Sequence, residues 1–181
     1  MPESMEHTQL ERVARRVEPQ GTLLRAWPLQ GGVSAQVTAL EVSLPDGQTK
    51  KLVIRRHGAV DLKRNPHVAA DEFKLLRILQ GAGIAVPAPY HLDQSGEDIA
   101  TPYVVVEYVE GQPDFSPSDL DDVIRRMATQ LVAIHRVDVA DCALSFLPRQ
   151  ANLCAEKIGK RPLRLDETFS EGRIRDTLEA A

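Results

Sequence analysis

The sequence contains few residues of the kinds that form cross-links, metal sites or stacking platforms for nucleic-acid bases. Its 181 residues include two cysteines, five histidines and only 4% aromatic residues. Cys142 and Cys154 do not form a C-x-x-C pair, which argues against a disulfide framework and favours a reducing compartment. The scattered histidines and cysteines have no spacing typical of zinc ligands. These absences predict a cytoplasmic protein without a zinc site.

Long apolar runs and an excess of basic charge are also missing. No apolar run approaches the roughly 20 residues that span a bilayer, and residues 1–6 lack the basic and apolar regions of a secretory signal. The formal net charge is −4, so a general affinity for nucleic acid or anionic membranes is not expected. The basic cluster over residues 50–64 has no aromatic neighbours that could stack on RNA bases. We therefore expect neither nucleic acid nor a membrane among the partners.

What is present is the composition of an ordinary folded domain, with 43% apolar and 27% charged residues. Helical periodicity is found over residues 5–17 and 66–79, and a polar loop is expected over 61–65. Strand-like runs cover residues 23–29, 37–44, 51–55 and 103–109, with a turn at 45–47 and a short extended piece at 87–89. This order predicts an α+β fold built on an antiparallel sheet.

The pattern changes after Gly111. Ser116 and Pro117 are typical of a helix N-cap followed by proline, with Asp119 placed for a weak capping box. A stripe of apolar residues at helical spacing follows, comprising Leu120, Val123, Ile124, Met127, Leu131 and Ile134. Further helices are expected at 150–158 and 169–181. We therefore predict an N-terminal helix (1–20), a lobe (21–111) and a second helical region (112–181).

Three features in a fixed order suggest a binding site for phosphates. A glycine pair between strands, Gly31-Gly32-Val33-Ser34, is most simply a tight turn, but its backbone N–H groups and the Ser34 hydroxyl could also approach phosphate oxygens. Arg55 ends an apolar strand two strands later. Glu72 lies on or beside the apolar face of the next helix, where a carboxylate needs a partner such as Arg55. Each charge alone is most simply solvated; in this order they describe a cradle for a nucleotide triphosphate.

The combined pattern resembles the aminoglycoside phosphotransferase and choline kinase-like superfamily. Within it, the chain is most similar to phosphotransferase-like proteins related to those fused to some acyl-CoA dehydrogenases. The resemblance is carried by Gly31-Gly32-x-Ser34, Leu52-Val53-Ile54-Arg55-Arg56, Asp71-Glu72-Phe73-x-Leu75-Leu76, Val86-Pro87-x-Pro89, Val105-Val106-Glu107-Tyr108-Val109-x-Gly111 and Leu131-x-x-Ile134-His135-x-Val137-Asp138. It covers roughly residues 25–140, and residues 170–175 also fit.

The resemblance implies a protein-kinase-like N-terminal lobe followed by helices of an incomplete second lobe. Residues Gly31, Gly32, Val33 and Ser34 would form the nucleotide loop. Arg55 would be the phosphate-pairing cation, where many relatives carry lysine, and Glu72 its carboxylate partner.

The same resemblance implies contacts to the rest of the nucleotide. Glu107, Tyr108 and Val109 would form a linker that meets the adenine through backbone groups, whereas His135 matches a position that we interpret as structural. For the full-length protein it implies ATP and Mg²⁺ as cofactors and a small-molecule hydroxyl acceptor; no cofactor is certain for this chain.

The residues that would carry out catalysis do not follow these motifs. Neither His91-Leu92-Asp93 nor His135-Arg136-Val137-Asp138 is followed by the loop and asparagine of such kinases. We expect that loop, and every catalytic residue, beyond Ala181, so this chain should bind nucleotide weakly and be inactive alone.

Two alternatives were weighed against the kinase interpretation. The first is a non-catalytic nucleotide-binding or interaction module, which would form homo-oligomers through the exposed apolar faces of helices at 117–137 and 169–181. The second is a hydrolase, because Gly32-Val33-Ser34 nearly matches a G-x-S-x-G elbow. The second glycine is missing, however, and a strand follows where that motif needs a helix.

Overall fold

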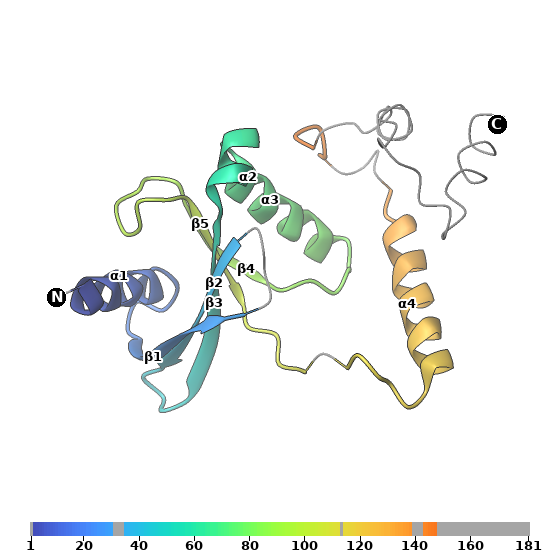
Figure 1. The fold of residues 1–181 in the computed structure, drawn as a ribbon, viewed down its shortest axis with the longest axis horizontal. Coiled ribbons are helices and arrows are strands. Elements are labelled where there is room, and N and C mark those ends of the chain that lie inside the picture. The colour runs from blue at the N-terminus through green and yellow to red at the C-terminus, as the bar shows by residue number, and fades with distance from the viewer. Residues whose placement is uncertain (1, 31–34, 113, 139–142, 148–181) are drawn as a thin grey trace, which may run out of the picture. The chain divides into compact units, whose positions relative to one another are not determined.

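The computed structural model describes residues 2–30, 35–112, 114–138 and 143–147, with only the backbone for residues 2–6. In chain order the elements are α1 (Pro2–Val17), β1 (Thr22–Leu29), β2 (Ala35–Ser43), β3 (Thr49–His57), α2 (Ala59–Arg64), α3 (Val68–Gly81), β4 (Pro89–Asp93), β5 (Tyr103–Glu107) and α4 (Leu120–His135) (Figure 1). All of them lie in one compact unit, Met1–Phe146. The helices expected at 150–158 and 169–181 fall outside the described residues, and the predicted domain boundaries stay predictions. No described helix is both long and apolar enough to cross a membrane.

The strands form one five-stranded sheet in the order β1-β2-β3-β5-β4, in which every neighbouring pair is antiparallel. The turn between β2 and β3 follows the sequence prediction. Gly47 has φ of 82°, a conformation that glycine adopts without strain, and its N–H donates to the carbonyl of Leu44 at 3.0 Å. The Asp46 carboxylate accepts from the Gln48 N–H at 3.0 Å, which fixes the turn further. The predicted α+β fold on an antiparallel sheet is confirmed.

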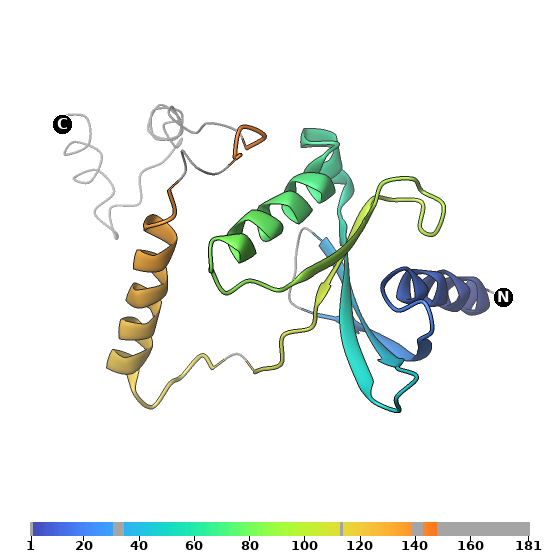
Figure 2. The ribbon, with the colours of Figure 1, turned by 180° about the vertical axis from the view of Figure 1, so that it is seen from behind.

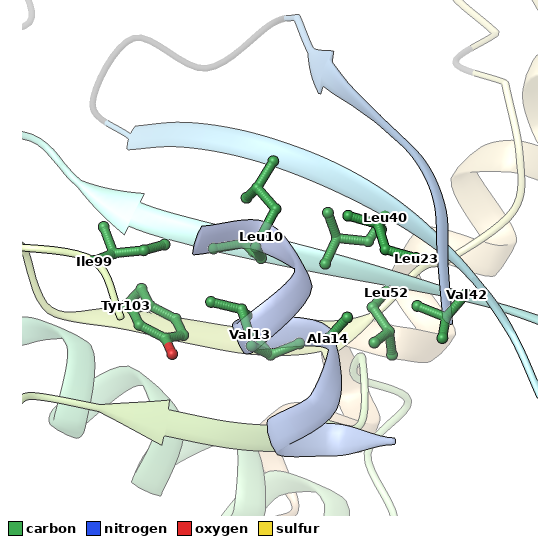
Figure 3. Close-up of a cluster of buried hydrophobic side chains, with 11 residues drawn as sticks. Leu10, Val13, Ala14, Leu23, Leu40, Val42, Leu52, Ile99 and Tyr103 are labelled. Carbon is green, nitrogen blue, oxygen red and sulfur yellow. The ribbon is translucent and has the colours of Figure 1, made fainter. Parts of the chain in front are cut away.

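Helices cover both faces of this sheet. Figures 1 and 2, seen from opposite sides, both place the sheet between α1 and α3. Because side chains alternate along a strand, each strand contributes to two separate cores. The core under α1 is the larger, and Figure 3 shows its residues: Leu10, Val13, Ala14, Leu23, Leu40, Val42, Leu52, Ile54, Ile99, Tyr103 and Val105. The core under α3 consists of Val53, Ala69, Val104 and Val106, with partly buried neighbours that include Phe73 and Leu76.

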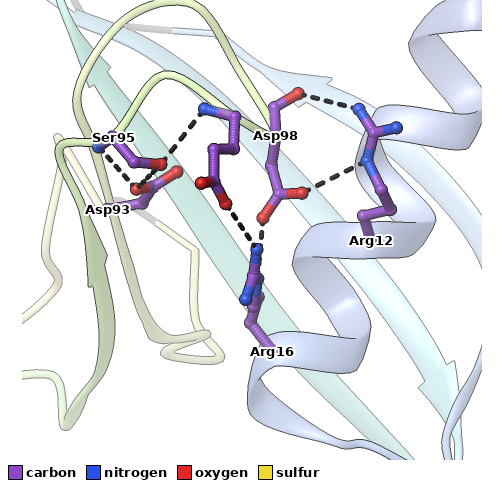
Figure 4. A network of polar contacts seen from close by, with 6 residues as sticks. Arg12, Arg16, Asp93, Ser95 and Asp98 are labelled. Carbon is purple, nitrogen blue, oxygen red and sulfur yellow. Dashed lines mark hydrogen bonds and ion pairs between the residues drawn. The ribbon is translucent and has the colours of Figure 1, made fainter.

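A polar network joins α1 to the loop between β4 and β5 (Figure 4). The side chain of Asp98 in this loop is only 4% exposed. Arg12 Nε lies 3.2 Å from one of its carboxylate oxygens, and Arg16 Nε lies 2.8 Å from the other. Arg12 Nη2 also donates to the Asp98 carbonyl at 3.3 Å. The buried charge of Asp98 is therefore matched by two cations on neighbouring turns of one helix, as burial of a carboxylate requires.

Residues 61–64 of the segment that the sequence predicted as a polar loop (61–65) are helical. Helix α2 (Ala59–Arg64) buries none of its residues, so it has no apolar periodicity to read. Its charges instead match the helix dipole, with Asp61 in the first turn and Lys63 and Arg64 in the last. The Asn65 N–H continues the ladder by donating to the Asp61 carbonyl at 2.8 Å. Local electrostatics therefore account for a helix that packing does not explain.

The N-cap predicted at Ser116 was also wrong. Helix α4 begins at Leu120, and Asp119 caps it by accepting from the Asp122 N–H at 2.9 Å. Asp119 takes the cap because its backbone is extended directly before the first helical residue. The predicted apolar stripe lies on this helix, and most of it is solvent-exposed: Leu120, Ile124, Met127, Leu131 and Ile134.

Candidate functional site

The candidate site is built on β3, the central strand of the sheet. Leu52 and Ile54 belong to the core under α1, whereas Val53 belongs to the core under α3. The alternation of side chains therefore places Arg55 on the α3 side as well. Arg55 is paired with Val37 on β2 and with Val104 on β5, so apolar residues of two strands flank it.

Helix α3 supplies the carboxylate. Ala69 is fully buried against the sheet, and Glu72 follows it by three residues, which places both on one helix face. Arg55 Nη1 lies 3.0 Å from Glu72 Oε1, with the side chains 41% and 19% exposed respectively. The ion pair predicted between Arg55 and Glu72 is confirmed.

A third residue, His57, completes the arrangement, and the sequence analysis missed it. His57 Nε2 lies 2.6 Å from Glu72 Oε2, and the imidazole is only 7% exposed. An ionised carboxylate can only accept hydrogen bonds, so Nε2 must carry the proton and donate. Glu72 thus bridges Arg55 through one oxygen and His57 through the other. The available signal was the period of the strand, because His57 follows Arg55 by two residues and shares its face.

Arg55 keeps donors that Glu72 does not use. A guanidinium has five N–H groups in a planar fork, and the ion pair joins one of its nitrogens, Nη1, to Glu72. The Arg55 Nε is buried and has no hydrogen-bond partner among the described residues. Because 41% of the side chain is exposed, an anion in solvent can reach donors of the guanidinium other than the buried Nε. The arrangement is thus a fixed cation with spare donors, which suits a phosphate.

Comparison with known proteins identifies the family. Residues 27–181 match the sequence model of the phosphotransferase enzyme family. The chain belongs to this family. It is 26% identical over 116 residues to acyl-CoA dehydrogenase family member 10 of Mus musculus, an alignment that covers 60% of this chain and 11% of the mouse protein.

The fold is shared with a crystal structure from Ralstonia eutropha JMP134, of a protein assigned as an aminoglycoside phosphotransferase. The TM-score is 0.59 at 19% identity, over 84% of this chain and 44% of the other. This chain therefore spans less than half the length of either protein. The five-stranded sheet with its flanking helices is the kinase-like N-terminal lobe that the sequence predicted.

The structure describes only some of the other residues predicted to form the phosphotransferase site. Gly31, Gly32, Val33 and Ser34 lie outside the described residues. The strands on either side are described, and their last paired residues are Leu29 and Val37. The role predicted for the glycine turn stays a prediction.

The predicted linker follows the end of β5. The Glu107 N–H donates to the Ala88 carbonyl at 2.8 Å, so this amide already has a partner within the lobe. Tyr108 packs on the core under α3 and contacts Trp27, with ring centroids 6.1 Å apart. Val109 is exposed. Of the three linker residues, Tyr108 therefore lies on the same side of the sheet as Arg55.

Magnesium, which phosphotransferases of this kind use, is not assigned to any residue of the lobe. In the part of the chain that the structure describes, no group of three or more histidine, cysteine, aspartate or glutamate side chains could hold a metal ion. Glu72 is engaged by Arg55 and His57 rather than by other carboxylates. Side chains that could together hold a metal ion are thus not found among the described residues.

Proposed function

We propose that this lobe binds the phosphates of ATP, and that the full-length protein transfers the γ-phosphoryl group to a hydroxyl of a small molecule. The observation that carries the proposal is the ion pair between Arg55 and Glu72, 3.0 Å apart at the edge of a buried core. Phosphoryl transfer depends mainly on positioning and on electrostatic stabilisation of the phosphate oxygens. A cation on a central strand, fixed by a carboxylate from a packed helix, supplies both.

The chemistry of arginine suits this role. Its planar fork can donate two parallel hydrogen bonds to a phosphate, whereas lysine offers a point charge. Membership of the phosphotransferase family supports the assignment of the phosphate as that of a nucleotide. Leu29, Val37 and Tyr108 pack on the same side of the sheet as Arg55 and give the nucleoside an apolar surface to approach. The predicted glycine loop, residues 31–34, joins the two strands that carry Leu29 and Val37.

The test compares ATP binding by the wild-type chain and by Arg55→Ala, using calorimetric titration. Hydrogen bonds to charged groups contribute about 1.5–3 kcal/mol, so we expect a loss of affinity of roughly ten- to hundredfold. Arg56→Ala is the matched control. It removes the same charge from the next residue of β3, which the alternation of side chains along a strand places on the opposite face of the sheet. Equal ATP affinity for wild type and Arg55→Ala would contradict the proposed placement.

A second candidate function is a non-catalytic module that self-associates. The observation that favours it is the exposed apolar stripe of α4, which includes Ile124, Met127 and Leu131. Met127→Glu would place a charge in the centre of this stripe and should shift an oligomer towards the monomer in sedimentation velocity. A wild-type chain that stays monomeric at high concentration would exclude this candidate.

A further inference from the structure

The phosphate site proposed above uses Arg55 and Glu72 but gives no task to His57. This histidine is nevertheless the least exposed of the three side chains, at 7%, against 19% for Glu72 and 41% for Arg55. Its contact with Glu72 is also the shorter, at 2.6 Å compared with 3.0 Å. Exposure and contact distance therefore both increase from His57 through the Glu72 carboxylate to Arg55, that is, from the interior towards solvent.

The Arg55 contact alone is a poor way to hold Glu72. The terminal torsion of a glutamate is broad, so a single contact leaves the carboxylate free to rotate. An ion pair between partly exposed, long side chains is weak, because ordering both side chains opposes the attraction. A second hydrogen bond to the other oxygen removes that freedom.

His57 is well suited to provide this second contact. An imidazole has only two side-chain torsions, and burial restricts both. His57 lies on the same strand and face as Arg55, two residues further along. Strand β3 thereby holds the carboxylate of α3 at two points that belong to one rigid element, and Oε1 is left facing Arg55.

We propose that His57 is a positioning residue of the phosphate site: it donates from Nε2 to Glu72 Oε2 and so orients Glu72, which in turn holds Arg55 towards the phosphates. The proposal rests on the proposed function for its phosphate part. Its geometric part, the dependence of Arg55 on His57, concerns this chain alone and can be measured without nucleotide.

Two variants separate positioning from simple filling of a buried space. His57→Gln keeps an N–H donor, because the amide nitrogen of glutamine can reach the place of the imidazole Nε2. His57→Leu fills the space without a donor. Loss of one ordinary hydrogen bond corresponds to roughly a two- to tenfold change in an equilibrium constant. We expect ATP to bind two- to tenfold more weakly to His57→Leu and within about twofold of wild type to His57→Gln.

The second readout is the NMR signal of the Arg55 Nε–Hε group, recorded in ¹⁵N-edited spectra without nucleotide. This signal is assigned by its absence from the spectrum of Arg55→Ala. A held guanidinium gives a displaced, slowly exchanging signal, whereas a free one resembles the other surface arginines. We expect the signal to move towards the free position in His57→Leu and to stay in place in His57→Gln. In the wild-type chain, a long-range ¹⁵N spectrum should also show a protonated Nε2 on His57. This measurement does not depend on the folding of any variant.

The outcomes separate the two proposals. Suppose that His57→Leu binds ATP like wild type and leaves the Arg55 signal unchanged, whereas Arg55→Ala loses binding. This result would overturn the role of His57 and leave the phosphate site intact. Equal losses in His57→Gln and His57→Leu, or an unprotonated Nε2, would also overturn it. If Arg55→Ala binds ATP normally while His57→Leu still frees the Arg55 signal, the phosphate site fails and the positioning of Arg55 stands.

Discussion

Asp98→Asn is the substitution that most directly tests how α1 is held to the sheet. Each carboxylate oxygen of Asp98 is paired with a different arginine: one accepts from Arg16 Nε at 2.8 Å, and the other lies 3.2 Å from Arg12 Nε in an ion pair (Figure 4). Asparagine has a single oxygen that accepts; its other terminal atom is a donor. In the variant, one arginine must therefore face an amide N–H group at a position whose side chain is only 4% exposed.

The size of the effect follows from the two charged contacts of the Asp98 carboxylate, with Arg12 and with Arg16. A charge-assisted contact contributes about 1.5–3 kcal/mol, and one of the two is lost. The other changes from a charged to a neutral acceptor and loses roughly half of its strength. The arginines are about half exposed, so water compensates part of both losses. We expect Asp98→Asn to lower the free energy of unfolding by about 1.5–3 kcal/mol.

The assay is equilibrium unfolding in urea, followed by the fluorescence of Trp27, the single tryptophan of the chain. A lower midpoint with an unchanged slope would report a loss of stability rather than a change in the unfolded state. Glu97→Gln is the matched control, because it removes the same charge from the neighbouring residue, which is 73% exposed and 3.5 Å from Arg16 Nη2. We expect Glu97→Gln to lower the free energy of unfolding by less than about 0.5 kcal/mol. If the two variants unfold within 0.5 kcal/mol of each other, the reasoning from burial is wrong.

Two further substitutions probe the core under α1. Burial, together with the charges of Asp93 and Asp98, raises the pKa of the Tyr103 hydroxyl, which has no partner of acceptable geometry among the described residues. Because the folded state keeps the phenol proton, the fold loses stability as the pH rises above the ordinary phenol pKa of about 10, and Tyr103→Phe should abolish that loss. Removal of the unpartnered hydroxyl should also add up to about 1 kcal/mol at pH 7, so a large destabilisation in urea at pH 7 would contradict this. At Gly21 an added Cβ would lie 2.6 Å from Val42 Cγ1. Gly21→Ala should therefore lower the free energy of unfolding by about 1–3 kcal/mol. An unchanged melting temperature would contradict this and show that the side chains around Val42 move to make room for the methyl group.

The sequence predicted the elements whose apolar residues keep a clear period. The helix expected at 66–79 is α3 (Val68–Gly81), and the strand expected at 51–55 lies within β3 (Thr49–His57). The end of β3 was missed because Arg56 and His57 continue the strand with polar side chains. The apolar run stops at Ile54, although the backbone pairing continues to His57 opposite Ala35. The missing histidine of the site is a direct result of that early boundary.

The errors elsewhere have a different physical origin. Helix α2 has no buried residue, so no hydrophobic pattern distinguished it from a loop. At the start of α4, Ser116 and Asp119 are both good caps, and only the backbone conformation decides between them. By contrast, the contact between Arg55 and Glu72 was predictable because a carboxylate on a packed face requires a cation within reach. The roles of Glu107, Tyr108 and Val109 depend on a nucleotide and stay predictions.

The position of the ion pair follows from two hydrophobic periods that meet at one place. On β3 the period of two sends Leu52 and Ile54 into the core under α1 and leaves Arg55 on the other face. A shift of one residue would bury the guanidinium among apolar side chains under α1, where desolvation of an unpaired charge costs several kcal/mol. On α3 the helical period that packs Ala69 against the sheet turns Glu72 towards the same edge. The apolar residues of β3 and α3 therefore determine where the two charges meet, although neither charge belongs to either core.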